Sequence, residues 1–225
     1  MPKLAQKLAQ KKPLEMRTVS AKLTKRADAE PGSITGQPVV IGSRTDLGWF
    51  DEVIERGALD ETNLNDVRLC LNHDTSYVYA RSRRNNPNST MQLSTDPNGL
   101  YFEAGLDLDI PAHRDLYGMI EREDIDKMSF MFSIDEYEWE DLESDHPTRH
   151  ITKIGTIVEI SAVTFPAYEA TSIEINERSR EALEKARQEL ESAREQRKKS
   201  PEGVDTQKQL ELAKAKLNLL RRTTQ

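Results

Sequence analysis

The chain has 225 residues and a formal net charge of −7, with 36% hydrophobic and 32% charged residues. This composition supports one sizeable core and leaves part of the chain for extended or helical tails. The one cysteine excludes an internal disulfide framework, and no apolar run is long enough for a membrane span or a secretory signal. We therefore expect a protein that works inside a cell.

Charge is distributed unevenly along the chain. Residues 1–26 carry eight Lys or Arg against one Glu, and residues 177–225 carry thirteen basic against nine acidic residues. The middle, residues 27–176, holds the remaining 11 basic and 29 acidic residues, a net charge of −18. Such an acidic centre disfavours nucleic acid as a partner. It favours solubility first and basic polypeptide partners second.

The first residues are predicted to form a basic leader. Leu4 and Leu8 lie at helical spacing among lysines, which predicts a short helix that ends near Pro13. We assign residues 1–16 to this leader, outside the core.

A series of predicted strands follows the leader. Alternating or bounded apolar runs predict strands at 17–25, 38–41, 67–71, 77–81, 90–94 and 100–108. Residues 48–59 mix aromatic and charged side chains, which favours a packed loop or a short helix. Leu116 and Ile120 lie at helical spacing, and we predict one helix over residues 111–123.

His73 follows the strand predicted at residues 67–71. Three apolar residues of that strand face one way, and the next position on that face is His73. A lone histidine there is more often a hydrogen-bonded structural side chain than a functional one. Cys70 is expected to point to the opposite face and to be inert, as small buried thiols usually are.

Ser129 lies in the middle of an apolar strand predicted at residues 126–134. Alternation places the aromatic residues of this strand on one face and Ser129 on the other. Most strand serines are solvated or bonded to backbone, so position alone does not identify a nucleophile. The acidic stretch 135–145 that follows is expected to be a solvated hairpin or loop.

Glu159 is the single charged residue after Gly155 in the last predicted core strand, residues 151–165. Burying a carboxylate is costly unless it is paired or hydrogen-bonded, so this position implies a partner. A structural ion pair, exposure at a sheet edge and an orienting role in a site all remain open. A short strand is predicted at 171–175.

The character of the chain changes at residue 177. Apolar stripes at 183–193 and 210–220 predict two amphipathic helices, separated by Ser200-Pro-Glu-Gly203. We assign residues 177–225 to a charged helical tail that docks on a partner or is removed.

His73, Ser129 and Glu159 are together the residue types of a hydrolytic triad. A serine hydroxyl needs an imidazole to accept its proton as it attacks a carbonyl, and the imidazole needs an acceptor on its other nitrogen. No Gly-x-Ser-x-Gly elbow is present, and no oxyanion donors are evident from the sequence.

No cofactor or metal is expected. Nucleotide-binding fingerprints and cysteine pairs are absent from the sequence. His146 and His150 lie four residues apart, but Pro147 disfavours the helix that would present both to one ion.

Five motifs occur in order along the chain: Glu52-Val-Ile-Glu-Arg-Gly-Ala-Leu59, Val67-Arg-Leu-Cys-Leu-Asn-His-Asp74, Gly99-Leu-Tyr-Phe-Glu-Ala104, Met128-Ser-Phe130 and Val158-Glu-Ile-Ser-Ala-Val-Thr-Phe-Pro-Ala-Tyr168. This series resembles the prohead (capsid maturation) serine proteases of tailed bacteriophages. The resemblance covers about residues 17–176, which we assign to a serine protease domain.

The resemblance implies a mainly β fold with flanking helices (α+β), whose β-barrel core is similar to that of the herpesvirus assembly proteases. It implies that His73 is the catalytic histidine and Ser129 the nucleophile. Glu159 is the preferred third member, and His150 is the alternative because the herpesvirus relatives use a second histidine.

The implied activity is cleavage of scaffolding protein, or of a scaffold-like extension of the major capsid protein. It would take place inside the prohead in the host cytoplasm, and the protease itself is a further expected substrate. A homo-oligomer is compatible with the sequence, whereas membrane and nucleic-acid partners are not expected.

Two other functions fit the same residues. A non-enzymatic assembly factor would bind capsid subunits and use the three polar residues structurally, and a different hydrolase, such as an esterase, would act on small esters. A fluorophosphonate label and an ester assay separate them. No label indicates a binding protein, and label with activity on esters alone indicates an esterase.

Overall fold

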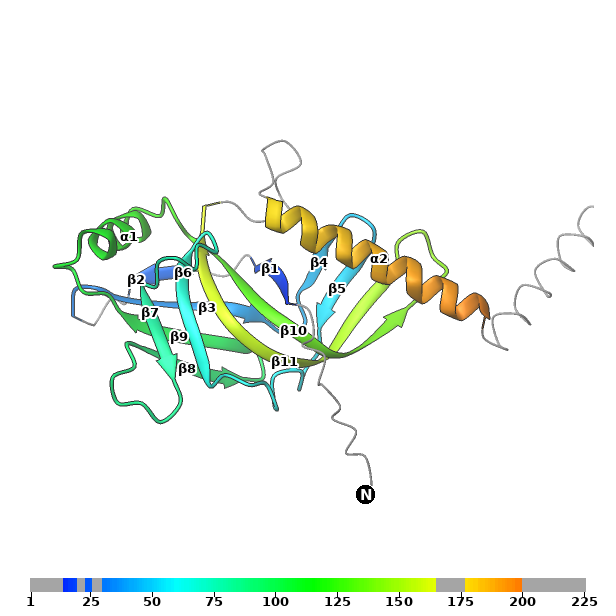
Figure 1. Cartoon of the computed structure of the whole chain (residues 1–225), viewed down its shortest axis with the longest axis horizontal. Helices are drawn as coiled ribbons and strands as arrows, with labels where there is room; N and C mark the ends of the chain where they lie inside the picture. Colours follow the sequence, from blue (N-terminus) through cyan, green and yellow to red (C-terminus); the bar gives the residue numbers. More distant parts are fainter. Residues whose placement is uncertain (1–13, 20–22, 26–29, 165–176, 200–225) are drawn as a thin grey trace, which may run out of the picture.

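The computed structural model describes residues 14–19, 23–25, 30–164 and 177–199. Strands in two sheets predominate, and two helices flank them (Figure 1). The larger sheet contains β1 (Glu15–Val19), β4 (Arg44–Asp46), β5 (Asp51–Ile54), β6 (Asp66–Leu71), β7 (Ala80–Arg83), β10 (Lys127–Glu140) and β11 (Thr148–Val163). The smaller sheet contains β2 (Leu23–Lys25), β3 (Ser33–Val40), β8 (Met91–Asp96) and β9 (Gly99–Gly105). The helices are α1 (Pro111–Glu121) and α2 (Glu177–Lys199).

The long hairpin of β10 and β11 is the centre of the larger sheet, whose strand order is β1-β10-β11-β5-β4. Strand β11 is antiparallel to β10 but parallel to two other strands. Its residues 148–151 pair with β5, and its residues 159–162 pair with β6. Strand β11 therefore brings segments that are distant in sequence next to one another.

The two sheets enclose one apolar core. The aromatic face of β10 points into it, with the rings of Phe130 and Phe132 stacked 4.6 Å apart and both side chains fully buried. Leu100 and Phe102 enter from the smaller sheet, and Leu116 enters from α1. Burying an apolar side chain of this size contributes about 1.5–3 kcal/mol to stability, so these contacts fix the orientation of β10. The opposite face of β10, which carries Ser129, therefore points away from the core.

The sheets are not closed into a barrel, in contrast to the expected β-barrel core. In the described residues, isolated backbone hydrogen bonds rather than a continuous ladder join the two sheets. Thr90 N–H donates to the Arg81 carbonyl at 3.0 Å, and Leu23 N–H donates to the Asp126 carbonyl at 3.2 Å. Closure requires a continuous ladder between all neighbouring strands. The expected mainly β, α+β class is confirmed.

Most predicted elements are present, with shifted bounds. Strands β6, β8 and β9 and helix α1 lie where the sequence predicts them. The single strand expected at 17–25 is instead two strands, because β1 pairs with β10 in the larger sheet and β2 pairs with β3 in the smaller one. The strand expected at 77–81 begins only at Ala80, and the one expected at 38–41 already begins at Ser33.

The prediction of a packed loop or short helix for residues 48–59 is wrong, because these residues contain strand β5. Of the two alternatives for residues 135–145, the hairpin is the one observed, since β10 continues to Glu140 and the turn to β11 follows it. In both places, backbone hydrogen bonds to β11 stabilise a strand that the local composition alone does not favour. The predicted leader helix, the strand at 171–175 and the second tail helix fall on residues outside those described. The last two residues assigned to the leader belong to β1.

Helix α2 packs along the larger sheet beside β4 and β5 (Figure 1). Leu190 is 3% exposed and joins Leu47, Phe50 and Leu142 in a second apolar cluster. The first helix of the predicted tail thus docks on the chain's own sheet. None of the described helices is long and apolar enough to cross a bilayer.

Candidate active site

Ser129 lies on β10, on the face opposite the core aromatics. Its side chain is buried, with 1% of the residue exposed, and its Oγ lies 2.6 Å from His73 Nε2. The same hydroxyl is 2.9 Å from the main-chain carbonyl oxygen of Arg17 on β1, to which it can also donate. A hydroxyl carries one hydrogen, so it donates to one of these two acceptors at a time.

His73 lies just beyond the end of β6, in a turn with an unusual backbone conformation. Asn72 and His73 have φ of 50° and 60°, the left-handed region. The Asn72 side-chain oxygen accepts a hydrogen bond of 3.0 Å from Thr164 N–H, which ties this turn to the end of β11. The turn, rather than strand alternation, therefore directs the imidazole of His73.

Glu159 lies on β11 and is 2% exposed. Its Oε2 is 2.7 Å from His73 Nδ1, so the partner that burial requires is the histidine. With a carboxylate on Nδ1 and a hydroxyl on Nε2, the favoured neutral tautomer carries its hydrogen on Nδ1 and accepts at Nε2.

The sheet register explains how these side chains meet. Ser129 pairs with Ser161 on β11, and Ser161 pairs with Cys70 on β6. Residues paired across neighbouring strands point to the same face. Glu159 is two residues before Ser161 and shares that face, so three strands present their polar residues to one place.

Ser161, which the sequence analysis did not single out, contacts both Glu159 and His73. Its hydroxyl donates to Glu159 Oε1, and its Oγ accepts a hydrogen bond of 3.0 Å from the backbone N–H of His73. The signal for it in the sequence is its position two residues after the lone carboxylate. We call His73, Ser129, Glu159 and Ser161 the serine cluster.

Cys70 is on the same face as Ser161 and Glu159, so the expectation that alternation points it away from the face of His73 is wrong. The left-handed turn at residues 72–73 breaks the alternation on which that expectation depended. Burial, together with the Glu159 carboxylate, raises the pKa of Cys70 to about 12. The nucleophilic thiolate is therefore scarce at neutral pH.

His150, the alternative third member, is not brought together with His73. Its Nδ1 is 2.7 Å from Glu55 and its Nε2 is 3.1 Å from Glu140. Hydrogen bonding to Glu55 raises the pKa of His150. It lies near the start of β11, whereas Glu159 lies near its end.

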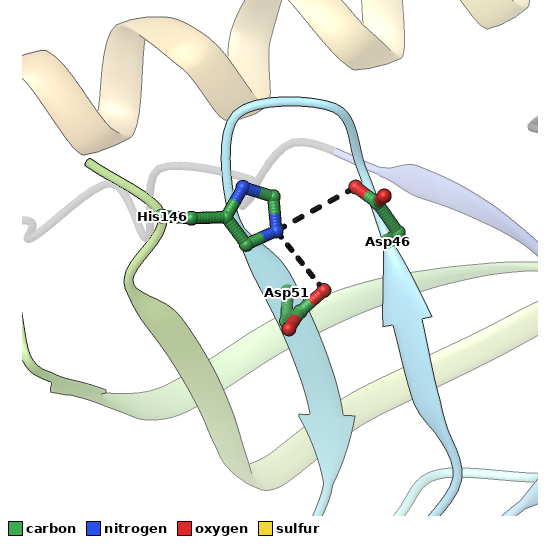
Figure 2. Close-up of side chains that lie close together, drawn as sticks. All are labelled: Asp46, Asp51 and His146. Atoms are coloured by element: carbon green, nitrogen blue, oxygen red, sulfur yellow. Dashed lines mark hydrogen bonds and ion pairs between the residues drawn. The ribbon is translucent and has the colours of Figure 1, made fainter. Parts of the chain in front are cut away.

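His146 lies between two aspartates of the β4–β5 hairpin (Figure 2). Its Nε2 is 3.1 Å from Asp51 Oδ1 and 3.7 Å from Asp46 Oδ1. These are residue types that hold metal ions, but Arg44 already donates to Asp51 at 2.7 Å. Because His146 and His150 contact different carboxylates, they do not form a shared pair of ligands.

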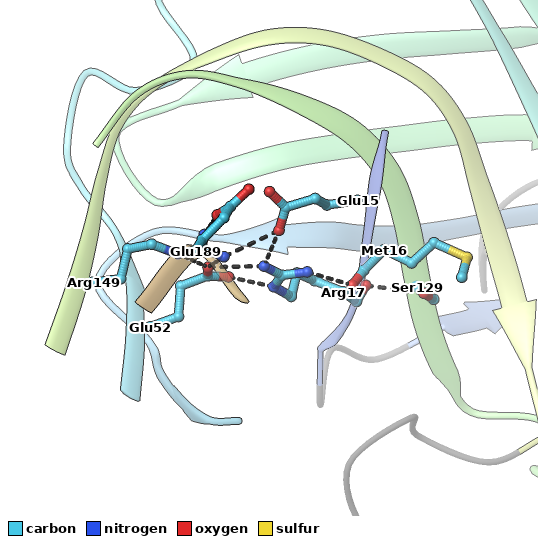
Figure 3. A network of polar contacts seen from close by, with 7 residues as sticks. All are labelled: Glu15, Met16, Arg17, Glu52, Ser129, Arg149 and Glu189. Carbon is cyan, nitrogen blue, oxygen red and sulfur yellow. Dashed lines mark hydrogen bonds and ion pairs between the residues drawn. The ribbon is translucent and has the colours of Figure 1, made fainter. Parts of the chain in front are cut away.

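A second buried polar network, the ionic cluster, is connected to the serine cluster through β1 (Figure 3). It consists of two guanidinium and three carboxylate side chains: Glu15, Arg17, Glu52, Arg149 and Glu189. Glu52 accepts hydrogen bonds from both arginines, at 2.9 Å from Arg17 Nη2 and 2.6 Å from Arg149 Nη2. Burial alone would raise the pKa of Glu52, but the two guanidinium charges hold it below its ordinary value.

The serine cluster has the order that acyl transfer requires: hydroxyl, imidazole, carboxylate. A sequence model of the family described as Caudovirus prohead serine protease matches residues 18–186, which include the whole cluster and the first part of α2. Among curated proteins and among solved structures, none matches the chain significantly.

Proposed function

The chain belongs to the family of caudovirus prohead serine proteases, and from that premise we propose that it is an endopeptidase whose catalytic residues are Ser129, His73 and Glu159. The observation that carries the proposal is the continuous chain of contacts, 2.6 Å from Ser129 Oγ to His73 Nε2 and 2.7 Å from His73 Nδ1 to Glu159 Oε2. Both distances are within the reach of proton transfer and orientation.

In the proposed mechanism, His73 Nε2 accepts the hydroxyl proton as Ser129 Oγ attacks the scissile carbonyl carbon. The imidazolium that forms is stabilised by the carboxylate of Glu159, which does not itself take the proton. His73 then gives the proton to the leaving amine, and an acyl-enzyme remains on Ser129. Water, deprotonated by His73, hydrolyses this ester and restores the hydroxyl.

The proposed substrates are scaffolding protein, or a scaffold-like extension of the major capsid protein, and the protease itself. In this proposal the enzyme acts inside the prohead. Ser129 is 1% exposed and Thr18 of β1 pairs with it. A polypeptide therefore reaches the hydroxyl only when neighbouring segments move, which fits an enzyme that becomes active on assembly.

We further propose that the protease unit of residues 17–176 keeps α2 docked on it and that removal of tail residues occurs beyond this helix. The packing of Leu190 supports a cut beyond α2, because cleavage before α2 would uncover the second apolar cluster. Mass spectrometry of the active enzyme beside its Ser129→Ala form tests self-cleavage. Identical termini in both would contradict it.

The central experiment is to mix the protein, or its Ser129→Ala variant, with the major capsid and scaffolding proteins of the same phage under assembly conditions. We expect cleavage by the wild type and none by Ser129→Ala. Ser133→Ala is a matched control, because Ser133 is another buried serine of β10 whose Oγ accepts a backbone N–H, from Thr156 at 3.1 Å. It should retain activity.

Labelling with a fluorophosphonate probe gives an independent readout. Wild type and Ser133→Ala should become labelled under assembly conditions, and Ser129→Ala should not. Cleavage retained by Ser129→Ala would refute the proposed nucleophile. A properly assembled shell with neither label nor cleavage would instead indicate a non-enzymatic assembly factor.

A further inference from the structure

Ser161 is the most enclosed residue of the serine cluster, with 0% of its surface exposed. It lies on β11 between Ser129 of β10 and Cys70 of β6, on the face that carries Glu159. It is 88 positions from His73 in sequence, and yet its side chain bonds to that residue's backbone.

The hydroxyl of Ser161 makes two bonds with defined directions. Its hydrogen is donated to Glu159 Oε1, while the other oxygen of that carboxylate, Oε2, lies 2.7 Å from His73 Nδ1. Its oxygen accepts the backbone N–H of His73 at 3.0 Å. Ser161, Glu159 and His73 thus form a closed ring of hydrogen bonds. In this ring the single oxygen atom Ser161 Oγ bonds to both residues of the Glu159–His73 contact.

This ring restrains two groups, the carboxylate of Glu159 and the backbone of His73, and it adds to the hydrogen bonds that Asn72 makes with β11. A carboxylate with one bonded oxygen can rotate about its last side-chain torsion, which is broad. A left-handed conformation at a non-glycine residue such as His73 is rare and persists only where its surroundings impose it. Ser161 bonds the free carboxylate oxygen and the N–H of the left-handed residue together.

A buried strand serine usually does no more than satisfy a backbone group, and Ser133 on β10 is such a case. Ser161 differs because the same oxygen serves both the proposed base and its carboxylate. We infer that Ser161 is a positioning residue for the proposed protease activity, which acts on the reaction through Glu159 and His73 and does not touch the substrate. This inference rests on the proposed function.

The test is Ser161→Ala, measured with Ser133→Ala as its matched control, under the assembly conditions in which the wild type cleaves its capsid substrate. A small misplacement of catalytic groups lowers the rate by up to about 100-fold. We expect kcat to fall about 10- to 100-fold with KM within about twofold. The control, which also leaves one backbone N–H without its acceptor, should keep its kcat.

A double variant separates positioning from general damage. If Ser161 acts through Glu159 and His73, then adding Ser161→Ala to His73→Ala should lower kcat by no more than about twofold, because both routes end at the His73 imidazole and a residue that works through a partner has no effect once the partner is lost. Reductions that multiply in the double variant, or equal kcat in Ser161→Ala and Ser133→Ala, would overturn the inference. If Ser161→Ala does not fold, Ser161→Cys replaces it in the test, because a cysteine keeps a weak hydrogen-bond donor. We expect Ser161→Cys to show the same selective fall in kcat. An unchanged kcat in this variant would overturn the inference.

Failure of the inference and failure of the proposed function give different experimental results. If the proposed function is wrong, Ser129→Ala remains active or no variant is labelled by the fluorophosphonate. If only the role of Ser161 is wrong, Ser129→Ala is inactive and unlabelled, while Ser161→Ala cleaves at the rate of its control.

Discussion

The serine cluster and the ionic cluster are both buried and both draw residues from β11, but they are built from different groups. The serine cluster joins two hydroxyls, an imidazole and one carboxylate through directional hydrogen bonds. The ionic cluster joins two guanidiniums and three carboxylates through charge. Arg17 touches both, with its side chain in the ionic cluster and its carbonyl near Ser129 Oγ.

The difference shows what each arrangement can do. An imidazole between a hydroxyl and a carboxylate can accept and return a proton near neutral pH. A guanidinium cannot, and although burial by itself lowers the pKa of Arg149, the carboxylates of Glu52 and Glu15 raise it above its ordinary value. We therefore expect changes in the serine cluster to reduce catalysis, and changes in the ionic cluster to alter stability rather than catalysis.

The largest expected effect tests the catalytic side of the comparison. Glu159→Gln keeps the shape of the side chain but removes the charge that stabilises the imidazolium of His73. We expect kcat to fall about 10³- to 10⁴-fold, which raises the barrier by about 4–5.5 kcal/mol. Steady-state kinetics on the capsid substrate measures kcat, and thermal unfolding checks the fold. A kcat within tenfold of wild type would contradict the role of Glu159.

The next effect tests the structural side. Glu52→Ala leaves two buried guanidiniums without their shared partner, and we expect it to lower the free energy of unfolding by about 3–5 kcal/mol. Glu61→Ala is the control, because it removes an exposed partner of Lys153 and should have no measurable effect. Urea unfolding monitored by the fluorescence of the tryptophans compares them. Equal stabilities would show that the ionic cluster does not stabilise the fold.

The lowered pKa of Glu52 also predicts that the stability of the protein depends on pH. The folded-state pKa of Glu52 is held below its ordinary value, so its stabilising contribution is complete above about pH 4.5 and is lost as the pH falls through the folded-state pKa. We expect the urea midpoint of the wild type to fall in this acidic range more steeply than that of Glu52→Ala. Parallel pH profiles would contradict this assignment.

A smaller effect is expected where α2 docks on the sheet. Leu190→Ala removes a side chain that is 3% exposed, and we expect it to lower the free energy of unfolding by about 2–4 kcal/mol while kcat per folded molecule is unchanged. Lys185→Ala, at an exposed position of the same helix, is the control. A loss of kcat in Leu190→Ala beyond the fraction unfolded would mean that the helix and the serine cluster are coupled.

The smallest effect concerns Glu189, because the ionic cluster contains one more carboxylate than guanidinium groups. Glu189 contacts Arg149, but burial and the nearby carboxylate of Glu15 outweigh that contact and raise the pKa of Glu189. Ionised Glu189 therefore opposes folding above its raised pKa, and this penalty disappears as the pH falls below its ordinary value. We expect Glu189→Gln to be more stable than wild type at pH 7, by less than about 1 kcal/mol, and equal to it near pH 4. Thermal unfolding at both pH values checks this, and a destabilised variant at pH 7 would contradict it.

The local sequence pattern was sufficient to predict where a polar residue lies when it interrupts an apolar strand. Ser129 faces away from the aromatic residues of β10, and Glu159 is the lone charge in its strand, because alternation along one strand decides which face each side chain takes. The same reasoning failed for Cys70 and for residues 17–25. A left-handed turn resets the alternation after β6, and pairing with different partners divides one predicted strand between two sheets.

The sequence by itself therefore determined the types of side chain and the strand faces that present them: a hydroxyl on β10, a carboxylate on β11 and a histidine after β6. Only the tertiary structure decided that they meet, that Ser161 joins them, and that charges from β1, β5, β11 and α2 form one buried cluster. The physical reason is that alternation is a property of a few neighbouring residues. The register between strands far apart in the chain is set by how the whole apolar core packs.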